Sequence, residues 1–200
     1  MKRRFTGIIL ILAVALIIPL QGYAATTAKE TVEKGVNKLI ATLGDPAFKA
    51  KTKDAQIAQI GEEIEKIFDF KELSRRTLGR DWKKMKPEQQ KEFVQLFKEL
   101  LQGVYADRLL AYSDQKIIFD KETALKKGRA EVQSFLQTSD GKKIPLFYRL
   151  TDKSGSWKVY DVIIEGVSMV KNYRTQFRKI LSKDSPEKLL EILRDKVGKG

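Results

Sequence analysis

Residues 157–168, WKVYDVIIEGVS, carry the strongest indication of the fold. Residues 159–164 predict a strand that is apolar on both faces except at Asp161. A strand with one face in water should alternate apolar and polar side chains. This stretch therefore indicates a strand whose two faces are both covered, by helices or by a bound ligand. Gly166 ends the strand, and Ser168 is placed to cap a helix that follows.

Asp161 is the one charged side chain in this apolar run. A buried carboxylate needs partners for its charge. Three roles are open to it: a catalytic base, an ion-pair partner of Arg149 or Arg174, or a cap for a nearby helix. We favour the structural roles, because the sequence places no second catalytic group near Asp161.

Three further strands are predicted upstream, at residues 116–119, 130–138 and 144–151. The turn signals SDGK at 139–142 and DKSG at 152–155 connect the later strands. Consecutive strands joined by tight turns predict an antiparallel sheet of about four strands rather than a series of βαβ units.

Apolar residues at helical spacing flank these strands in the sequence. They predict helices with apolar stripes over residues 32–43, 57–67, 70–78 and 93–109 before the strands, and over 170–181 and 189–197 after them. Helices segregated from an antiparallel sheet define the α+β class. We expect residues 25–200 to form a single α+β domain, or two intertwined subdomains that share a core.

The first 24 residues are expected to be a signal peptide. A basic head, KRR at 2–4, precedes the apolar run 8–20 and the small residues Gly22 and Ala24. The alternative, a membrane anchor, is disfavoured because 13 helical residues rise only about 20 Å, against about 30 Å of hydrocarbon. Cleavage after Ala24 would export the protein from the cytoplasm.

The composition excludes several classes of site. The chain of 200 residues contains no His and no Cys, so imidazole bases, thiol nucleophiles and metal sites built on these residues are absent. The 39 basic residues outnumber the 26 acidic ones, and removal of residues 1–24 lowers the basic count by three, which leaves a net charge of +10. Export makes nucleic acid an improbable partner, whereas anionic lipid head groups or acidic protein faces fit the compartment.

The family resemblance rests on three segments. Residues 157–168 are followed by NYRTQF at 172–177, and upstream the run TLGRDW at 77–82 precedes PEQ at 87–89, Phe93, Phe97, Leu100 and Tyr105. Together they resemble the MlaC-type, or toluene-tolerance (Ttg2D-like), family of periplasmic phospholipid-binding proteins. The chain departs from that pattern at Lys86, where the family commonly has a Ser or Thr that caps a helix.

The resemblance implies a carrier that shuttles diacyl phospholipid through the periplasm of a Gram-negative bacterium, in support of outer-membrane lipid asymmetry. The implied fold is a curved sheet packed by helices, with an apolar lipid cavity between them. The implied partners are the substrate-binding subunit of an inner-membrane ABC transporter and an outer-membrane lipoprotein–porin complex. Such a carrier needs no catalytic residue, metal or cofactor, because phospholipid is its cargo.

We expect the cavity wall to be built from apolar and aromatic side chains near the sheet and the helices beside it. They are Phe97, Leu101, Tyr105, Phe135, Phe147, Tyr148, Val162, Ile164, Val167, Val170 and Tyr173. Val167 and Val170 are expected at the entrance, and basic side chains such as Arg80 or Arg174 near the lipid head group.

Two other functions remain open from the residues alone. Curved α+β sheets over an apolar cone also occur in isomerases and hydratases, and in such an enzyme Asp161 would act as the base. A protein-interaction module without a ligand is the third interpretation.

Overall fold

The computed structural model describes residues 26–112, 115–126, 128–153 and 155–198. The expected signal peptide, residues 1–24, lies outside the described residues. Within the described ranges, none of the helices combines the length and the apolar character needed to cross a bilayer.

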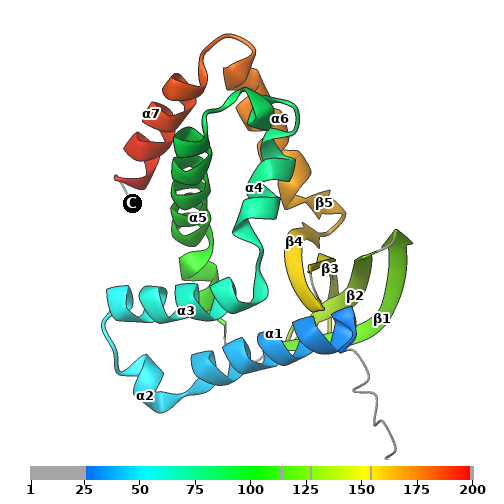
Figure 1. Ribbon diagram of the computed structural model, residues 1–200. Coiled ribbons are helices and arrows are strands. Elements are labelled where there is room, and N and C mark those ends of the chain that lie inside the picture. The colour runs from blue at the N-terminus through cyan, green and yellow to red at the C-terminus, as the bar shows by residue number, and fades with distance from the viewer. Residues whose placement is uncertain (1–25, 113–114, 127, 154, 199–200) are drawn as a thin grey trace, which may run out of the picture.

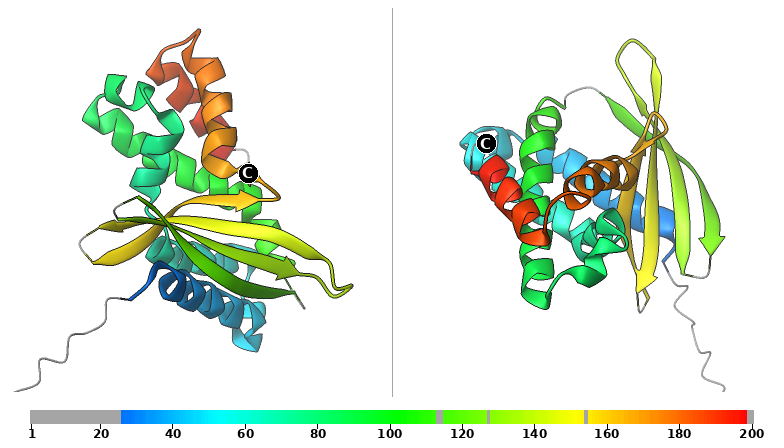
Figure 2. Two further views of the ribbon diagram at one scale, coloured as in Figure 1. Left: turned by 90° about the vertical axis from the view of Figure 1, so that its right-hand side faces the viewer. Right: turned by 90° about the horizontal axis from the view of Figure 1, so that it is seen from above.

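Five antiparallel strands form one sheet in chain order, and their twist is visible in both views of Figure 2. The strands are β1 (Lys116–Lys126), β2 (Arg129–Gln137), β3 (Lys143–Lys153), β4 (Ser156–Ile164) and β5 (Val167–Ser168). The predicted antiparallel sheet is confirmed, although β1 extends beyond the expected residue 119 and β5 is an additional strand. The side chains of β1 after Phe119 are exposed, so the sequence shows no alternation of apolar and polar residues there. Backbone pairing with β2 continues the strand beyond this point.

A left-handed turn connects β4 to β5. Glu165 and Gly166 have φ angles of 49° and 82°, a region that glycine adopts without the steric cost of a Cβ atom. The turn lets the two-residue β5 pair with the end of β4, where Ile163 lies opposite Ser168. The chain then enters the next helix directly, with Ser168 as its cap, as the sequence predicts.

The helices lie before and after the sheet in the sequence, as expected for the α+β class. They are α1 (Ala28–Gly44), α2 (Pro46–Lys49), α3 (Lys53–Ile67), α4 (Phe70–Leu78), the 3-10 helix η1 (Asp81–Lys84), α5 (Pro87–Leu110), α6 (Met169–Leu181) and α7 (Pro186–Val197). In Figure 1, α4 to α7 form one group, whereas α1 runs across the sheet and α3 lies beside α1. At the start of α5, the Lys86 side chain has no oxygen that could cap the helix. The backbone N–H of Lys86 donates a hydrogen bond to the side-chain oxygen of Gln89.

Two large buried clusters hold these layers together. One joins α4, α5, α6 and α7 around rings such as Phe93, Phe97 and Phe177, whose centroids are 5.3–5.5 Å apart. The other packs α1 against the sheet, with Val32 and Leu150 fully buried. Phe68 and Met169 contact both clusters.

Both faces of β4 are covered, as its composition predicts. On one face, Val159 and Val162 belong to the cluster that contains α1. On the other, the guanidinium of Arg76 in α4 stacks over the ring of Tyr160 with 3.8 Å to its centroid, and Asp161 bonds to the start of α6. Tyr160 is the extra residue of a bulge, because Arg149 pairs with Asp161 whereas the next residue, Leu150, pairs with Val159.

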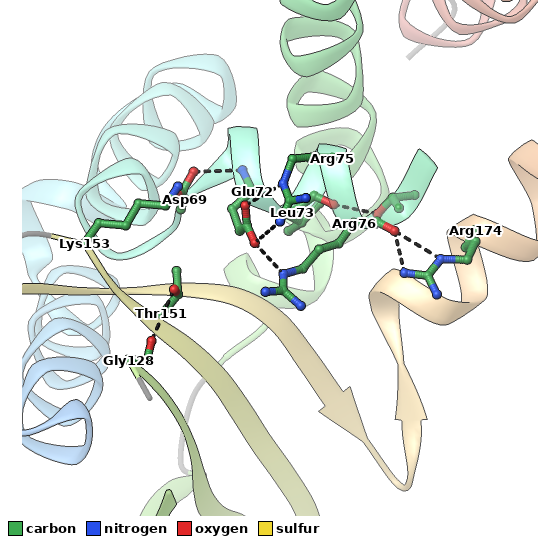
Figure 3. A network of polar contacts seen from close by, with 10 residues as sticks. Asp69, Glu72, Leu73, Arg75, Arg76, Gly128, Thr151, Lys153 and Arg174 are labelled. Carbon is green, nitrogen blue, oxygen red and sulfur yellow. Dashed lines mark hydrogen bonds and ion pairs between the residues drawn. The ribbon is translucent and has the colours of Figure 1, made fainter. Parts of the chain in front are cut away.

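A polar network positions α4 between the sheet and α6 (Figure 3). The buried carboxylate of Glu72 accepts hydrogen bonds from Nε and Nη2 of Arg75, at 2.9 and 2.7 Å, and from Nε of Arg76 at 2.7 Å. Asp69 caps the helix and also contacts Lys153 of β3. Arg174 of α6 donates from Nε to the backbone carbonyl of Arg76 at 3.0 Å. These bonds link three elements that are distant in sequence.

The first prediction concerns Glu72 and pH. The Arg75 hydrogen bonds lower the pKa of the Glu72 carboxyl from 4.5 to about 2. A carboxyl whose pKa is depressed by folding stabilises the folded protein above its unfolded pKa, and this contribution is lost as the pH falls toward the folded value. We expect Glu72→Gln to lower the free energy of unfolding by about 1–3 kcal/mol near neutral pH. The difference from the parent should shrink between about pH 4.5 and pH 2.

Urea unfolding at about pH 6 and about pH 3 measures this difference. Glu62→Gln is the matched control, because Glu62 is exposed in α3 and forms no ion pair with the described residues. A Glu72→Gln effect of equal size at both pH values would contradict the role assigned to the carboxylate.

The second prediction separates core from surface on α5. Phe97 is fully buried against three other aromatic rings, whereas Val104, two turns later, is 46% exposed. We expect Phe97→Ala to lower the free energy of unfolding by about 3–5 kcal/mol, and Val104→Ala to change it by less than about 0.5 kcal/mol. Urea unfolding of both variants tests this, and similar losses in the two would contradict the assignment of Phe97 to the core.

Candidate functional site

A cavity of about 400 Å³ lies between α1, α3, the C-terminal half of α5 and the sheet. All but four of its lining residues are aliphatic or aromatic. Protein interiors are close-packed and contain few voids larger than a water molecule. A space of this size and character is suited to an apolar ligand, which makes it the candidate site.

Helical and strand periodicity together produce the apolar wall. In α3, Ile57, Ile60 and Ile64 recur on one face and line the cavity. From the sheet, alternate residues of β3, among them Ile144 and Leu146, face the same space. The helices reach this space from one side and the strands from the other, and their side chains do not fill it.

Four polar residues complete the lining: Lys98, Gln102, Arg108 and Gln115. Lys98 is paired with Glu65 of α3, and the guanidinium of Arg108 lies 5.8 Å from the ring centroid of Tyr105. A second ion pair, Lys53–Asp107 at 2.8 Å, also joins α3 to α5. Both charged lining residues, Lys98 and Arg108, thus lie on α5, which is linked to α3 by these two ion pairs.

Two tyrosines of the wall, Tyr112 and Tyr148, stay neutral. Burial raises the pKa of Tyr148 well above its usual value, and burial also raises the pKa of Tyr112. Both phenols are therefore protonated throughout the physiological range. Their rings add apolar area to the wall without adding charge.

Five of the eleven expected wall residues line this cavity. They are Leu101, Tyr105, Tyr148, Val162 and Ile164. The structure brings them together from α5, β3 and β4, and Ile164 is 39% exposed at the end of its strand.

The other six expected residues lie elsewhere. Phe97, Val170 and Tyr173 pack in the α4–α7 cluster. Phe135 and Phe147 contact each other edge to face at 6.4 Å, on the opposite face of the sheet from Tyr148, because successive residues of a strand point to opposite faces. Val167 is 61% exposed on β5 and is not part of the wall.

The wide apolar stripe of α5 explains why the sequence alone does not separate the residues that line the cavity from those that pack in the core. The first half of α5 packs against α6 and α7, whereas its second half faces the cavity. The apolar stripes of α1 and α3, which include Ile40 and Ile60, also line the cavity, although the sequence alone does not place them there. Their periodicity was the available signal, but a stripe that faces a ligand and a stripe that faces a core look alike.

Arg80 and Arg174 were expected near the head group of a bound lipid. The structure places both on a second, separate pocket that shares no lining residue with the cavity. Lys98 and Arg108 are the basic side chains that line the cavity itself.

Asp161 has the two structural roles that we favoured. Its Oδ1 accepts a hydrogen bond from the backbone N–H of Val170 at 3.0 Å, and its Oδ2 accepts one from the Ser168 hydroxyl at 2.7 Å. Arg149 Nη1 lies 3.8 Å from Oδ2. The carboxylate is buried and is not part of the cavity lining, so a ligand in the cavity does not meet it.

Comparison with known proteins connects this geometry to a family. The family model described as MlaC protein matches residues 33–195, which confirms the resemblance inferred from the sequence. The solved structure of a phospholipid-binding protein from Ralstonia solanacearum, in complex with a phospholipid, is 28% identical with a TM-score of 0.78. That match covers 86% of this chain and 97% of the other.

Two curated proteins are also similar. The intermembrane phospholipid transport system binding protein MlaC of Haemophilus influenzae is 26% identical over 195 residues, which cover 95% of this chain and 91% of that protein. The toluene tolerance protein Ttg2D of Pseudomonas putida is 36% identical over 95 residues. The Ttg2D alignment spans 48% of this chain and 44% of that protein, less than half of either.

The third prediction tests the structural role of Asp161. Asp161→Ala leaves the Val170 N–H and the Ser168 hydroxyl without their acceptor, so we expect the free energy of unfolding to fall by about 1–3 kcal/mol. Asp161→Asn keeps an acceptor oxygen and should lose less. Asp195→Ala, at an exposed position of α7, is the control and should change stability by less than about 0.5 kcal/mol. Equal stability of Asp161→Ala and Asp195→Ala in urea unfolding would refute the capping role.

Proposed function

This chain belongs to the MlaC family, and we therefore propose that it is a phospholipid-binding carrier that moves lipid through the periplasm between the outer and inner membranes. The observation that carries the proposal is the apolar cavity of about 400 Å³ between the helices and the sheet. The phospholipid complex of the Ralstonia protein, which has the same fold, supports a diacyl phospholipid as the cargo.

The energetics of lipid transfer explain why a cavity alone is sufficient. Burial of apolar chain stabilises by about 0.8 kcal/mol per methylene. Two acyl chains of about 15 methylenes each would therefore cost on the order of 20 kcal/mol to expose to water. A protein that offers an apolar wall replaces one hydrocarbon environment by another, so the net free energy of transfer can be near zero. The carrier lowers the barrier to leaving the membrane without breaking a bond.

The chemistry of the wall fits this role and gives little support to catalysis. All but four lining residues are apolar, Tyr112 and Tyr148 are neutral, and the basic side chains come from α5. The alternative enzyme would use Asp161 as a base, but both oxygens of Asp161 are bonded to the start of α6 and the residue is absent from the cavity wall. The proposal therefore includes no reaction step and no cofactor.

The cellular setting is part of the same proposal. A signal peptide at residues 1–24 would deliver the chain to the periplasm of a Gram-negative bacterium, as a single domain from residue 25 onward. Its partners would be the substrate-binding subunit of an inner-membrane ABC transporter and an outer-membrane lipoprotein–porin complex, in a system that maintains outer-membrane lipid asymmetry. The name of the Haemophilus relative, an intermembrane phospholipid transport system binding protein, supports this setting.

The fourth prediction compares two isoleucines with equal exposure. Ile164 lines the cavity and is 39% exposed, whereas Ile118 of β1 is 41% exposed and is not part of the lining. A carboxylate at position 164 would face the acyl chains, and an unpaired charge next to hydrocarbon is strongly unfavourable. We expect Ile164→Glu to weaken lipid retention at least about tenfold, and Ile118→Glu to retain lipid as the parent does.

The measurement is native mass spectrometry of the purified proteins before and after incubation with an excess of acceptor vesicles. The parent should carry diacyl phospholipid, and its absence would overturn the proposed function. Equal retention by Ile164→Glu and Ile118→Glu would instead leave the function standing and show that the lipid binds elsewhere.

A further inference from the structure

A second pocket, of about 550 Å³, lies between α4, η1, α6 and the beginning of β2. We call it the arginine pocket, after its lining residues Arg75, Arg76, Arg80, Arg129, Arg174 and Arg178. Lys83 also lines it, so seven of its ten residues are cationic. These cations come from α4, its C-terminal loop, η1, α6 and β2, and the tertiary fold brings them into one concave site.

Three of the arginines are held in fixed positions (Figure 3). Arg75 and Arg76 are bonded to the buried carboxylate of Glu72. Arg76 is also stacked on Tyr160, and Arg174 donates both Nε and Nη2 to the backbone carbonyl of Arg76. Side chains ordered in this way lose little conformational entropy when an anion binds.

The protein balances only part of the pocket's positive charge, through the pairing of Glu72 with Arg75 and Arg76. Asp81 is the one acidic side chain of the lining, and its carboxylate is already paired with Lys84 at 2.6 Å. None of the described carboxylates forms an ion pair with Arg80, Arg129 or Arg178. In addition, Nη2 of Arg76 is buried and has no hydrogen-bond acceptor among the described residues. The pocket therefore combines excess positive charge with three arginines, Arg80, Arg129 and Arg178, that none of the described carboxylates neutralises and to which an oxyanion could bind.

The arginine pocket is separate from the lipid cavity. The two share no lining residue. Within β4, Val162 and Ile164 face the cavity, whereas Tyr160 lies under Arg76 of the arginine pocket. A ligand in one pocket does not have to displace a ligand in the other.

We propose that the arginine pocket binds a phosphate group, carried by a lipid head group at a membrane surface or by free phosphate. The planar guanidinium donates pairs of hydrogen bonds that match the oxygens of phosphate, which is why arginine predominates in phosphate sites. A concave site with fixed arginines favours such a compact anion over the extended acidic surface of a protein. The proposal goes beyond the carrier function and does not require it.

The test uses a double variant at two exposed arginines of the pocket. Arg80→Gln with Arg178→Gln removes two charges that form no ion pair with the described residues, so the fold should be retained. Lys34→Gln with Lys179→Gln is the matched control, because it removes the same charge from exposed positions outside the pocket. Circular dichroism and urea unfolding confirm that both proteins are folded.

Isothermal titration of the purified protein with inorganic phosphate gives the first readout. We expect binding to the parent and to the lysine control within about twofold of each other. Binding to the arginine variant should be at least about tenfold weaker, because the variant lacks two charged hydrogen-bond donors. Equal weakening in both double variants would show that net charge alone attracts the anion, and would overturn the pocket.

Vesicle flotation identifies the source of the phosphate. Vesicles of phosphatidylcholine with phosphatidylglycerol, compared with phosphatidylcholine alone, present a head-group phosphate on a membrane. The pocket binds a lipid head group if the parent and the lysine control float with the anionic vesicles and the arginine variant does not. It binds free phosphate if the protein binds inorganic phosphate but does not float with the vesicles. If neither probe binds, or if only polyglutamate does, the proposal is wrong, and binding of polyglutamate would indicate an acidic protein partner.

Discussion

Because β4 is apolar on both faces, exposing either face to water would be unfavourable. The rest of the structure depends on the elements that cover these two faces. One edge of β4 pairs with β3, while the other pairs with β5 and, at Val159, bridges to Phe68. One face packs against the cluster that contains α1, and the other meets α4 and the start of α6. Because the strand is enclosed in this way, it connects the sheet to both helical regions.

The cavity stays open because its walls are anchored outside it. The first half of α5 is fixed in the α4–α7 cluster, α1 is fixed on the sheet, and α3 packs with α1, α2 and the end of α5 in a third cluster around Leu43, Phe48 and Ile60. For the apolar side chains to collapse into the space, these anchors would have to move. An unfilled apolar space lowers stability in proportion to its volume, so a bound hydrocarbon chain would supply contacts that the protein alone does not make.

Charge and hydrocarbon are separated on the two sides of β4. The cavity is lined mostly by apolar side chains, whereas the arginine pocket gathers seven cations, of which Arg75 and Arg76 are paired with the buried Glu72. The bulge at Tyr160 helps to produce this separation, because the extra residue carries a ring on which Arg76 stacks. A strand without the bulge would lack this additional residue next to Asp161.

Periodicity, turn residues and a specific motif are local properties of the chain, so they already predict the α+β class, the antiparallel order of the strands, the six longer helices and the family, but not the short helices α2 and η1. The sequence also identified Asp161 as a buried carboxylate with structural partners. Only the tertiary structure decided which apolar stripes enclose a space and which fill a core. Phe97 and Leu101 lie one helical turn apart on α5 and belong to the same buried cluster, yet only Leu101 also lines the cavity. The physical reason is that a side chain's environment is set by the elements opposite it, and those elements are distant in sequence.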